Sequence, residues 1–245
     1  MNKLTEIEKQ YAAAVVRDMK ALNINDPKLW PMIRGSMKRV AYHEGGHFAA
    51  RCFTMLELSH VTEISIIGNE NNAGYVRSER NFTEQGLESY PPPLQRSNGY
   101  MLLLKDLAGY GAEMILDKSE EWGSIFEYYD SMYGDDWYGE REEGTDFYTA
   151  EQIAKIMSKP FMRDYRTLNL ASKWTLEMLR IPAVWNIVAT VADKLIKRGE
   201  INGNACEKLL NMAWDSEFPS IHNLPKWKRR IFPKPGELEK YIERA

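Results

Sequence analysis

The five consecutive residues His43-Glu44-Gly45-Gly46-His47 carry the side chains best suited to do chemistry in this chain. On a helix, the two histidines lie on one face, one turn apart. Two imidazoles placed in this way can both ligate one Zn²⁺ ion, and Glu44 lies beside the metal without being needed as a ligand. A carboxylate there can take a proton from an activated water and pass it to a leaving amine. The motif therefore predicts zinc-dependent hydrolysis.

The residues on both sides of this motif are mostly apolar. Val40–Tyr42 precede it, and Phe48, Ala49, Ala50, Cys52 and Phe53 follow it. An apolar helix with three polar side chains in its middle must provide partners for them, because unpaired buried polar groups are costly. A metal ion would supply one such partner. The alternative is a surface helix with two solvated histidines, and the apolar flanks favour the metal site.

A catalytic zinc site usually has three protein ligands and a water, so a third ligand is needed. His60 comes directly after the motif helix and His222 stands in a proline-flanked tail, so a carboxylate is favoured. Glu113 lies among small residues that allow close helix packing. Asp146 stands at the start of an expected helix, where its alternative role is an N-cap. The residue types alone leave Glu113 and Asp146 as equal candidates.

The composition, with 44% hydrophobic and 27% charged residues, is that of a soluble protein with a hydrophobic core. A net charge of −3 gives no basic field, so nucleic acid is not an expected partner. No apolar run reaches the roughly 18–20 residues that span a bilayer, and the first residues lack a signal-peptide segment. The cysteines, Cys52 and Cys206, do not form a disulfide framework. We therefore expect a cytoplasmic protein without a membrane partner.

Most of the elements expected around the motif are helices. Apolar spacing predicts helices over residues 4–22, 38–58, 97–116, 146–157, 161–180, 183–198 and 204–213. Alternating and β-branched residues predict a strand over Val61–Ile67 and a second strand from Tyr75. Pro91–Pro93 predict a stiff loop, and Gly199–Gly203 predict a turn. The expected fold class is mainly α (α+β), a helical zincin-like domain with a small β-sheet beside the motif helix.

Three regions are expected along the chain: an N-terminal helical extension (1–37), a domain that carries the zinc motif (38–215) and a basic C-terminal tail (216–245). Residues 117–145 look like an insertion, with ten acidic residues against two basic ones and seven aromatics. Acidic runs are usually solvated loops. Seven aromatics are many for such a loop, so a lid that favours basic or aromatic substrates is the alternative. We interpret the basic tail as solvated, with a membrane-surface or partner-docking role as its alternative.

Four blocks, in order, resemble the peptidase domain of FtsH-type, ATP-dependent zinc proteases. They are Val40–Ala50, Val61–Gly68 with its return at Gly74–Val76, Leu107–Glu113 and Thr145–Met157. Residues Trp185–Leu210 are similar to the last helices of that family. The likeness covers residues 38–212, and the ordered set of blocks is more specific than the zinc motif alone.

The resemblance implies that His43, His47 and Asp146 hold the zinc ion and that Glu44 is the catalytic base. It makes Glu113 a residue that orients one of the ligands. For Glu113, the alternative is a buried carboxylate that backbone groups satisfy.

The expected substrate is an unstructured polypeptide or one particular protein, cleaved by an endopeptidase. Ile64, Ser65 and Ile66 are the candidates for pairing with its extended backbone, because main-chain hydrogen bonds give affinity with little sequence preference. An ordinary sheet strand is the alternative interpretation of these residues. Three tyrosines are candidates for stabilising an oxyanion: Tyr42, Tyr75 and Tyr110.

Two features depart from the family pattern. FtsH-type proteases carry membrane helices and an ATPase module, whereas this sequence has no G-x-x-x-x-G-K-[ST] phosphate loop. The family also usually has arginine where Tyr110 stands. We therefore expect an ATP-independent enzyme that acts as a homo-oligomer or with a separate unfoldase partner. The alternatives are a non-catalytic regulatory or binding module, which would have no need of Glu44, and a zinc amidase for a small molecule.

Overall fold

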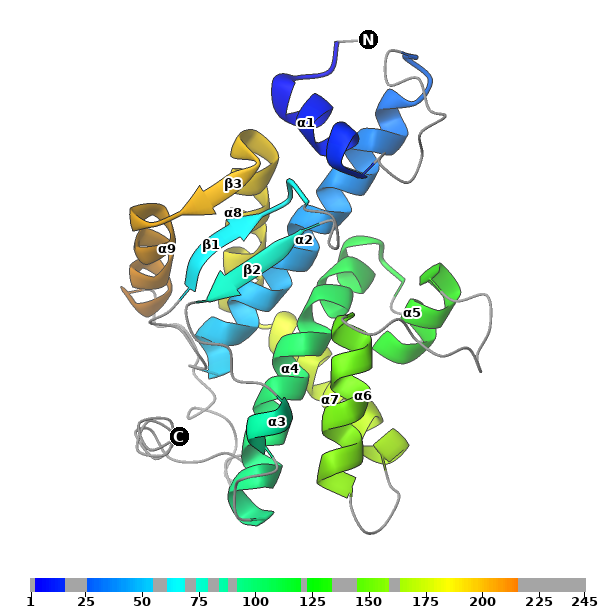
Figure 1. The fold of residues 1–245 in the computed structure, drawn as a ribbon, viewed down its shortest axis with the longest axis vertical. Coiled ribbons are helices and arrows are strands. Elements are labelled where there is room, and N and C mark those ends of the chain that lie inside the picture. Colours follow the sequence, from blue (N-terminus) through cyan, green and yellow to red (C-terminus); the bar gives the residue numbers. More distant parts are fainter. Residues whose placement is uncertain are drawn as a thin grey trace.

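The computed structural model describes residues 3–15, 26–54, 61–68, 74–78, 84–87, 92–119, 123–133, 145–158 and 164–215. These residues are mainly helical with one small sheet, so the expected mainly α (α+β) class is confirmed. The elements, labelled in Figure 1, are α1 (Glu6–Val15), α2 (Trp30–Thr54), β1 (Val61–Ser65), β2 (Tyr75–Ser78), α3 (Glu84–Leu87), α4 (Pro92–Leu116), α5 (Ile125–Tyr133), α6 (Asp146–Ser158), α7 (Asp164–Leu179), α8 (Pro182–Arg198), β3 (Glu200–Asn202) and α9 (Asn204–Asp215). No helix among the described residues has both the length and the apolar character needed to cross a membrane.

Helices α2 and α4, each of 25 residues, pack against each other through the middle of the molecule. The sheet, α8 and α9 lie on one side of α2, and α4 to α7 lie on the other (Figure 1). Two glycines inside the motif make these contacts close. A Cβ atom at Gly46 would overlap the backbone of Ala108 on α4, and one at Gly45 would lie 2.7 Å from the carbonyl oxygen of Val188 on α8. Close packing therefore requires glycine at positions 45 and 46, between the two histidines.

Helix α2 begins at Trp30, eight residues before the start that the sequence predicts. The expected boundary between 1–37 and the peptidase domain therefore falls inside one helix. Helix α1 packs on this added part of α2, and its Tyr11 hydroxyl is 2.7 Å from the Ser36 hydroxyl. Tyr11 is buried. The described N-terminal residues are thus part of the same folded unit as the motif helix.

Helix α4 also begins earlier than predicted, because Pro92 and Pro93 belong to its first turn rather than to a loop. Proline is accepted there, since the N–H groups of the first turn have no partner within the helix. Residues 97–116, the predicted helix, form the rest of α4.

The sheet has the strand order β2-β1-β3, with antiparallel pairs throughout. Strand β3 forms where a turn was predicted. Gly199 and Gly203, with φ of 78° and 48°, flank it in the left-handed region that glycine adopts easily, so the chain can turn on both sides of three extended residues. Ile201 of β3 pairs with Ile64 of β1 and is buried.

Strand β1 is the central strand, and this changes the interpretation of its residues. Ile64, Ser65 and Ile66 have no exposed surface. At Ile64 and Ser65, one edge of β1 pairs with β2 and the other with β3, and the Ile66 N–H donates to the Gly199 carbonyl oxygen. A substrate backbone therefore has no edge to pair with at Ile64, Ser65 and Ile66. The edge strand on the side of the motif is β2.

Part of the acidic segment 117–145 is helical rather than a solvated loop. Helix α5 packs its aromatic side chains against Phe147 of α6, with ring centroids 4.6 Å away for Phe126 and 4.5 Å for Tyr129. The Tyr128 hydroxyl donates to Asp117 over 2.8 Å. Phe126 and Tyr128 are buried in the core, which explains why an acidic segment contains aromatic residues. Residues 120–122 and 134–144 of the segment 117–145, which was interpreted as a loop or a lid, lie outside the described residues, as does the tail 216–245.

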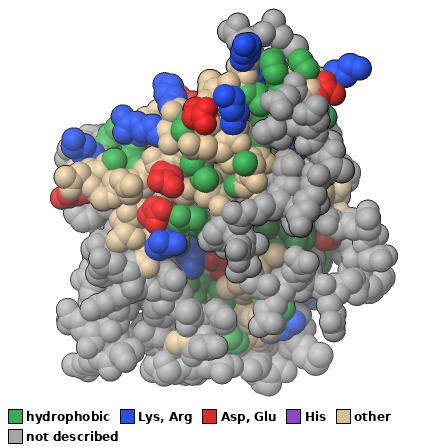
Figure 2. Space-filling model, turned by 45° about the horizontal axis from the view of Figure 1, so that its top comes forward, with side chains coloured by type: hydrophobic (Ala, Val, Ile, Leu, Met, Phe, Trp, Pro, Cys, Tyr) green, Lys and Arg blue, Asp and Glu red, His purple; other side chains and the backbone are tan. Residues whose placement is uncertain are grey.

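Charged side chains of both signs are interspersed with hydrophobic ones over the described part of the face in Figure 2. The described part of this face therefore carries no patch in which all charged side chains have the same sign of charge.

Candidate metal centre

Three donor atoms from two helices meet at one point. His43 and His47 lie one turn apart on α2, and Asp146 is the first residue of α6. The two Nε2 atoms are 3.0 Å apart, and Asp146 Oδ2 lies 3.0 Å from His47 Nε2 and 3.3 Å from His43 Nε2. Ligand atoms of a tetrahedral zinc site, with bonds of about 2.0–2.1 Å, are about 3.3 Å apart. The three atoms thus form a triangle close to the size of one face of such a site.

Gly109 of α4 keeps the space in front of the two imidazoles open. A Cβ atom there would lie 2.5 Å from His43 Nε2 and 2.6 Å from His47 Nε2. Any side chain at position 109 would therefore fill the space between the two nitrogens. Imidazole nitrogen and carboxylate oxygen are ligands that zinc accepts, so both the donor set and the open space fit a zinc ion.

The second nitrogen of each ring is also engaged, and α4 provides both partners. His43 Nδ1 is 2.5 Å from Glu113 Oε1, and His47 Nδ1 donates to the carbonyl oxygen of Lys105 over 2.8 Å. Metal-binding histidines usually donate this N–H to a carboxylate or a backbone carbonyl, which fixes the ring and leaves the other nitrogen to ligate. Glu113 therefore lies behind His43, whereas Asp146 approaches both Nε2 atoms. His60 and His222 lie outside the described residues.

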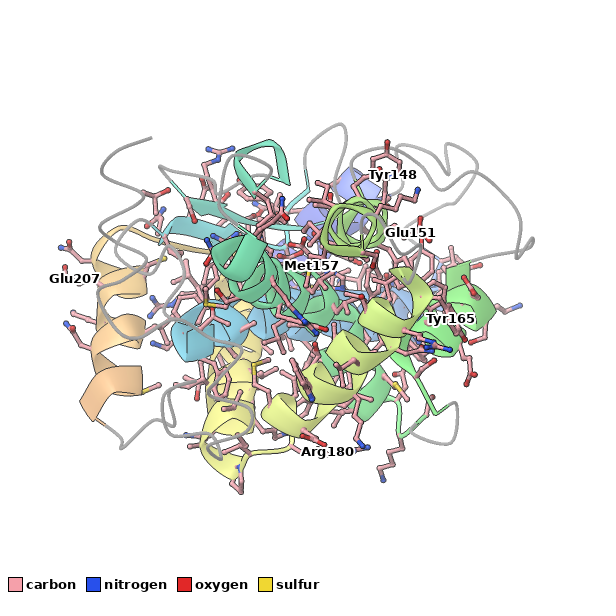
Figure 3. The ribbon with its side chains drawn as sticks, turned by 90° about the horizontal axis from the view of Figure 1, so that it is seen from below. Tyr148, Glu151, Met157, Tyr165, Arg180 and Glu207 are labelled. Atoms are coloured by element: carbon pink, nitrogen blue, oxygen red, sulfur yellow. The ribbon has the colours of Figure 1, made fainter. Side chains whose placement is uncertain are left out.

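Asp146 does not cap helix α6, although it is the first residue of that helix. The cap is Thr145, whose hydroxyl accepts a hydrogen bond from the N–H of Tyr148 over 3.2 Å. Tyr148 is labelled on α6 in Figure 3. Because Thr145 satisfies the helix terminus, the Asp146 carboxylate is left to face the histidines.

The charges of this cluster stabilise a cation at the imidazoles. Burial lowers the pKa of His43, but the hydrogen bonds with Asp146 and Glu113 outweigh it and raise that pKa well above its ordinary value. Burial acts to raise the pKa of Asp146, yet His47 and His43 hold it well below its usual range. Two carboxylates thus favour positive charge here, whether a proton or a metal ion carries it.

The Glu44 side chain lies between its own helix, α2, and the start of strand β2. A Cβ atom at Gly74, just before β2, would lie 2.7 Å from Glu44 Oε1 and 2.8 Å from a methyl group of Val40. Glu44 is 4% exposed. Burial raises its pKa to about 7, although His43 and His47 act to lower it. A carboxyl group with that pKa can gain and release a proton near neutral pH.

The motif residues line one cavity of about 480 Å³. Gly74 and the first two residues of β2, Tyr75 and Val76, form one wall, and Tyr11 of α1 lines the part nearest the start of α2. Arg51, Lys105 and Asp106 line the part beyond His47. The cavity thus extends along α2 on both sides of the metal-binding residues.

Arg51 belongs to this site, although the sequence did not single it out. It lies one turn beyond His47 and is buried. Its Nη1 donates to the Ser78 hydroxyl and its Nη2 to the Val76 carbonyl oxygen over 3.4 Å, so it joins the motif helix to β2. The sequence feature that could have identified Arg51 is an arginine within an apolar run, four residues after the second histidine.

The three tyrosines considered for an oxyanion lie in different places. The Tyr110 ring meets the His43 ring edge-on, with centroids 4.8 Å apart. The Tyr75 hydroxyl donates to Glu63 over 2.7 Å, and the Tyr42 ring packs against Trp185 of α8. Of the three, Tyr110 has its ring against a candidate metal ligand, His43.

No protein-family model matches this chain, and no curated protein matches its sequence. The resemblance to FtsH-type peptidases therefore stays a prediction from the residues of the chain.

Proposed function

We propose that this chain is a zinc-dependent endopeptidase of the FtsH type, with a zincin-like site, that hydrolyses polypeptides without ATP. The supporting observation is the convergence of His43, His47 and Asp146 donor atoms within 3.0–3.3 Å, with the other nitrogen of each ring held by α4. When bound by these three residues, zinc polarises the scissile carbonyl and lowers the pKa of a water toward about 7.

Glu44 moves the proton. Its carboxylate accepts a proton from the water whose oxygen bonds to the carbonyl carbon, and it gives that proton to the amine nitrogen as the C–N bond breaks. Burial raises the pKa of Glu44 to about 7 in the metal-free fold, and a cation at the imidazoles would lower it, which favours the ionised form that accepts the proton. The absence of a side chain at Gly74 leaves room for this carboxylate, because a Cβ atom there would lie 2.7 Å from Oε1.

Strand β2 holds the extended substrate. Among the described strands it pairs with β1 on one edge only, and Gly74–Val76 line the cavity. A free strand edge can pair with an added chain through main-chain hydrogen bonds. This mode gives affinity without strong side-chain preference, as an enzyme for unstructured polypeptides requires.

The test compares zinc-loaded wild type with Glu44→Gln on an unfolded protein and a degenerate peptide library, with cuts identified by mass spectrometry. Wild type should cut in the absence of ATP. Glu44→Gln should bind zinc with the same stoichiometry and make no cuts, whereas Asp146→Asn should lose zinc. Retained cleavage by purified Glu44→Gln would contradict the role of Glu44, and a wild type that binds zinc but cuts nothing would contradict the peptidase.

A further inference from the structure

Asp106 is a buried carboxylate that the proposed reaction does not use. Its side chain is 4% exposed and lines the same cavity as the motif residues. Lys105 Nζ lies 3.2 Å from Oδ1. The other oxygen, Oδ2, is buried and has no hydrogen-bond partner in the part of the chain that the structure describes.

A half-satisfied carboxylate is an unfavourable choice for this position. Asp106 lies between the apolar stretch Leu102–Leu104 and Leu107, which are all buried. Burying a carboxylate oxygen without a partner destabilises the fold. Burial also raises the pKa of Asp106; Lys105 acts to lower it and the nearby Asp146 to raise it further. A donor group of a ligand bound in the cavity would complete the hydrogen bonds of this carboxylate.

We propose that Asp106 is a specificity residue that receives a positively charged group of the substrate beside the scissile bond. The inference rests on the proposed peptidase function and names its substrate class, peptides with an ammonium or guanidinium group at this position. A lysine or arginine side chain or a free N-terminus could supply that group. Either would donate a charge-assisted hydrogen bond to Oδ2, the stronger kind of hydrogen bond.

The location of Asp106 puts this subsite next to the metal centre. The neighbouring residue, Lys105, accepts the hydrogen bond from His47 through its carbonyl oxygen. A cation at Asp106 is therefore close to the reacting carbonyl, which places it on a residue that flanks the cleaved bond. The ammonium of Lys105 already occupies Oδ1, so it competes with the substrate cation for the same carboxylate.

Peptide binding to zinc-loaded Glu44→Gln tests the proposal without requiring turnover. Peptides that carry lysine or norleucine at one position differ only by the ammonium, and each pair is made with free and with acetylated N-termini. The charged peptide should bind about tenfold tighter or more, as a charge-assisted hydrogen bond provides. In Glu44→Gln/Asp106→Asn the ratio should fall to about one, and in Glu44→Gln/Lys105→Met it should rise. A lysine-over-norleucine preference that survives acetylation identifies the side chain as the source, and a preference for free over acetylated peptides identifies the N-terminus.

Three results would overturn the proposal: lysine/norleucine and free/acetylated ratios that are both near one with Asp106 present, a preference that Asp106→Asn leaves intact, or no binding of any of the peptides. Thermal unfolding without peptide separates a structural role. Asp106→Asn should keep or raise the melting temperature, and a fall of several degrees would show that Asp106 serves the fold. Cleavage by wild type without a preference for charged peptides would contradict the specificity role of Asp106 but not the peptidase function. Asp106-dependent binding without cleavage would contradict the peptidase function but not the cation-binding role of Asp106.

Discussion

A hydrogen bond of 2.5 Å joins His43 Nδ1 to Glu113 Oε1 across the packed helices α2 and α4. Behind it, Arg39 Nε lies 3.9 Å from Glu113 Oε2, and Arg39 Nη2 lies 3.0 Å from Asp117. The orientation of the His43 ring is therefore set by a series of charged groups that leads away from the metal-binding nitrogen.

Glu113→Gln should weaken zinc binding by about 10–100-fold, the usual effect of losing the partner of a metal-binding histidine. The amide can still accept the N–H but lacks the charge that makes the imidazole a better ligand. Competition with a chromophoric chelator measures the affinity. Glu207→Gln is the matched control, because Glu207 is exposed on α9, far from α6 in Figure 3. Equal affinities for Glu113→Gln and wild type would contradict the assigned role.

Gly109→Ala should abolish zinc binding without unfolding helix α4. The added methyl group would lie within 2.6 Å of both Nε2 atoms, so it blocks the space in front of the imidazoles. Alanine is itself a better helix former than glycine. Gly35→Ala is the control, since a Cβ on that exposed position of α2 meets nothing within 4 Å. It should retain zinc and gain about 0.5–1 kcal/mol of stability. Stoichiometric zinc in Gly109→Ala would rule out this site.

Local spacing explains why the histidine pair could be read from the sequence, while the third donor could not be chosen from residue types. One helical turn brings His43 and His47 together, but Asp146 is 99 residues from His47 and Glu113 is 70 from His43. Both carboxylates reach His43, one at each nitrogen, so both were sound candidates. Only the resemblance of the four sequence blocks to FtsH-type peptidases favoured Asp146. In the structure Asp146 is the carboxylate that approaches both Nε2 atoms.

Elements that depend on long-range pairing escaped the sequence interpretation. Glu200–Asn202 reads locally as a turn between glycines, and it becomes a strand because β1 pairs with it. The same pairing makes β1 central and removes the expected substrate edge. Arg51 and Asp106 were not predicted as site residues, because a charged residue in an apolar run has no spacing signal that assigns it a role. In the fold each is buried and lines the cavity.

Metal-free protein should lose stability as the pH rises, and Glu44→Gln should remove part of this loss. The pKa of Glu44 is about 7 in the fold and near 4.5 when unfolded, so the folded state binds its proton more tightly. That contribution is complete below about pH 4.5 and is lost as the pH rises to about 7. Relative to wild type, Glu44→Gln should therefore gain up to about 3 kcal/mol between pH 5 and pH 8.

Urea unfolding of chelator-treated wild type and Glu44→Gln at pH 5 and pH 8 measures this difference. Saturating zinc should shrink it, because a nearby cation favours the ionised form of Glu44. If the two proteins show parallel pH dependence without metal, Glu44 does not titrate near neutrality in the fold.

Arg51→Met should show whether Arg51 positions strand β2 or supports metal binding. Methionine keeps much of the apolar stem but removes the donors to Ser78 and to the Val76 carbonyl oxygen, so we expect a loss of about 2–3 kcal/mol in stability. Zinc affinity should stay unchanged, because the ligands are held by α4 and α6. If β2 holds the substrate as proposed, the KM for extended peptides should rise more than kcat falls. Arg198→Met, at an exposed position of α8, is the control. An Arg51→Met protein with normal KM but weakened zinc binding would show that Arg51 supports the metal centre instead, and that the edge of β2 does not carry the substrate.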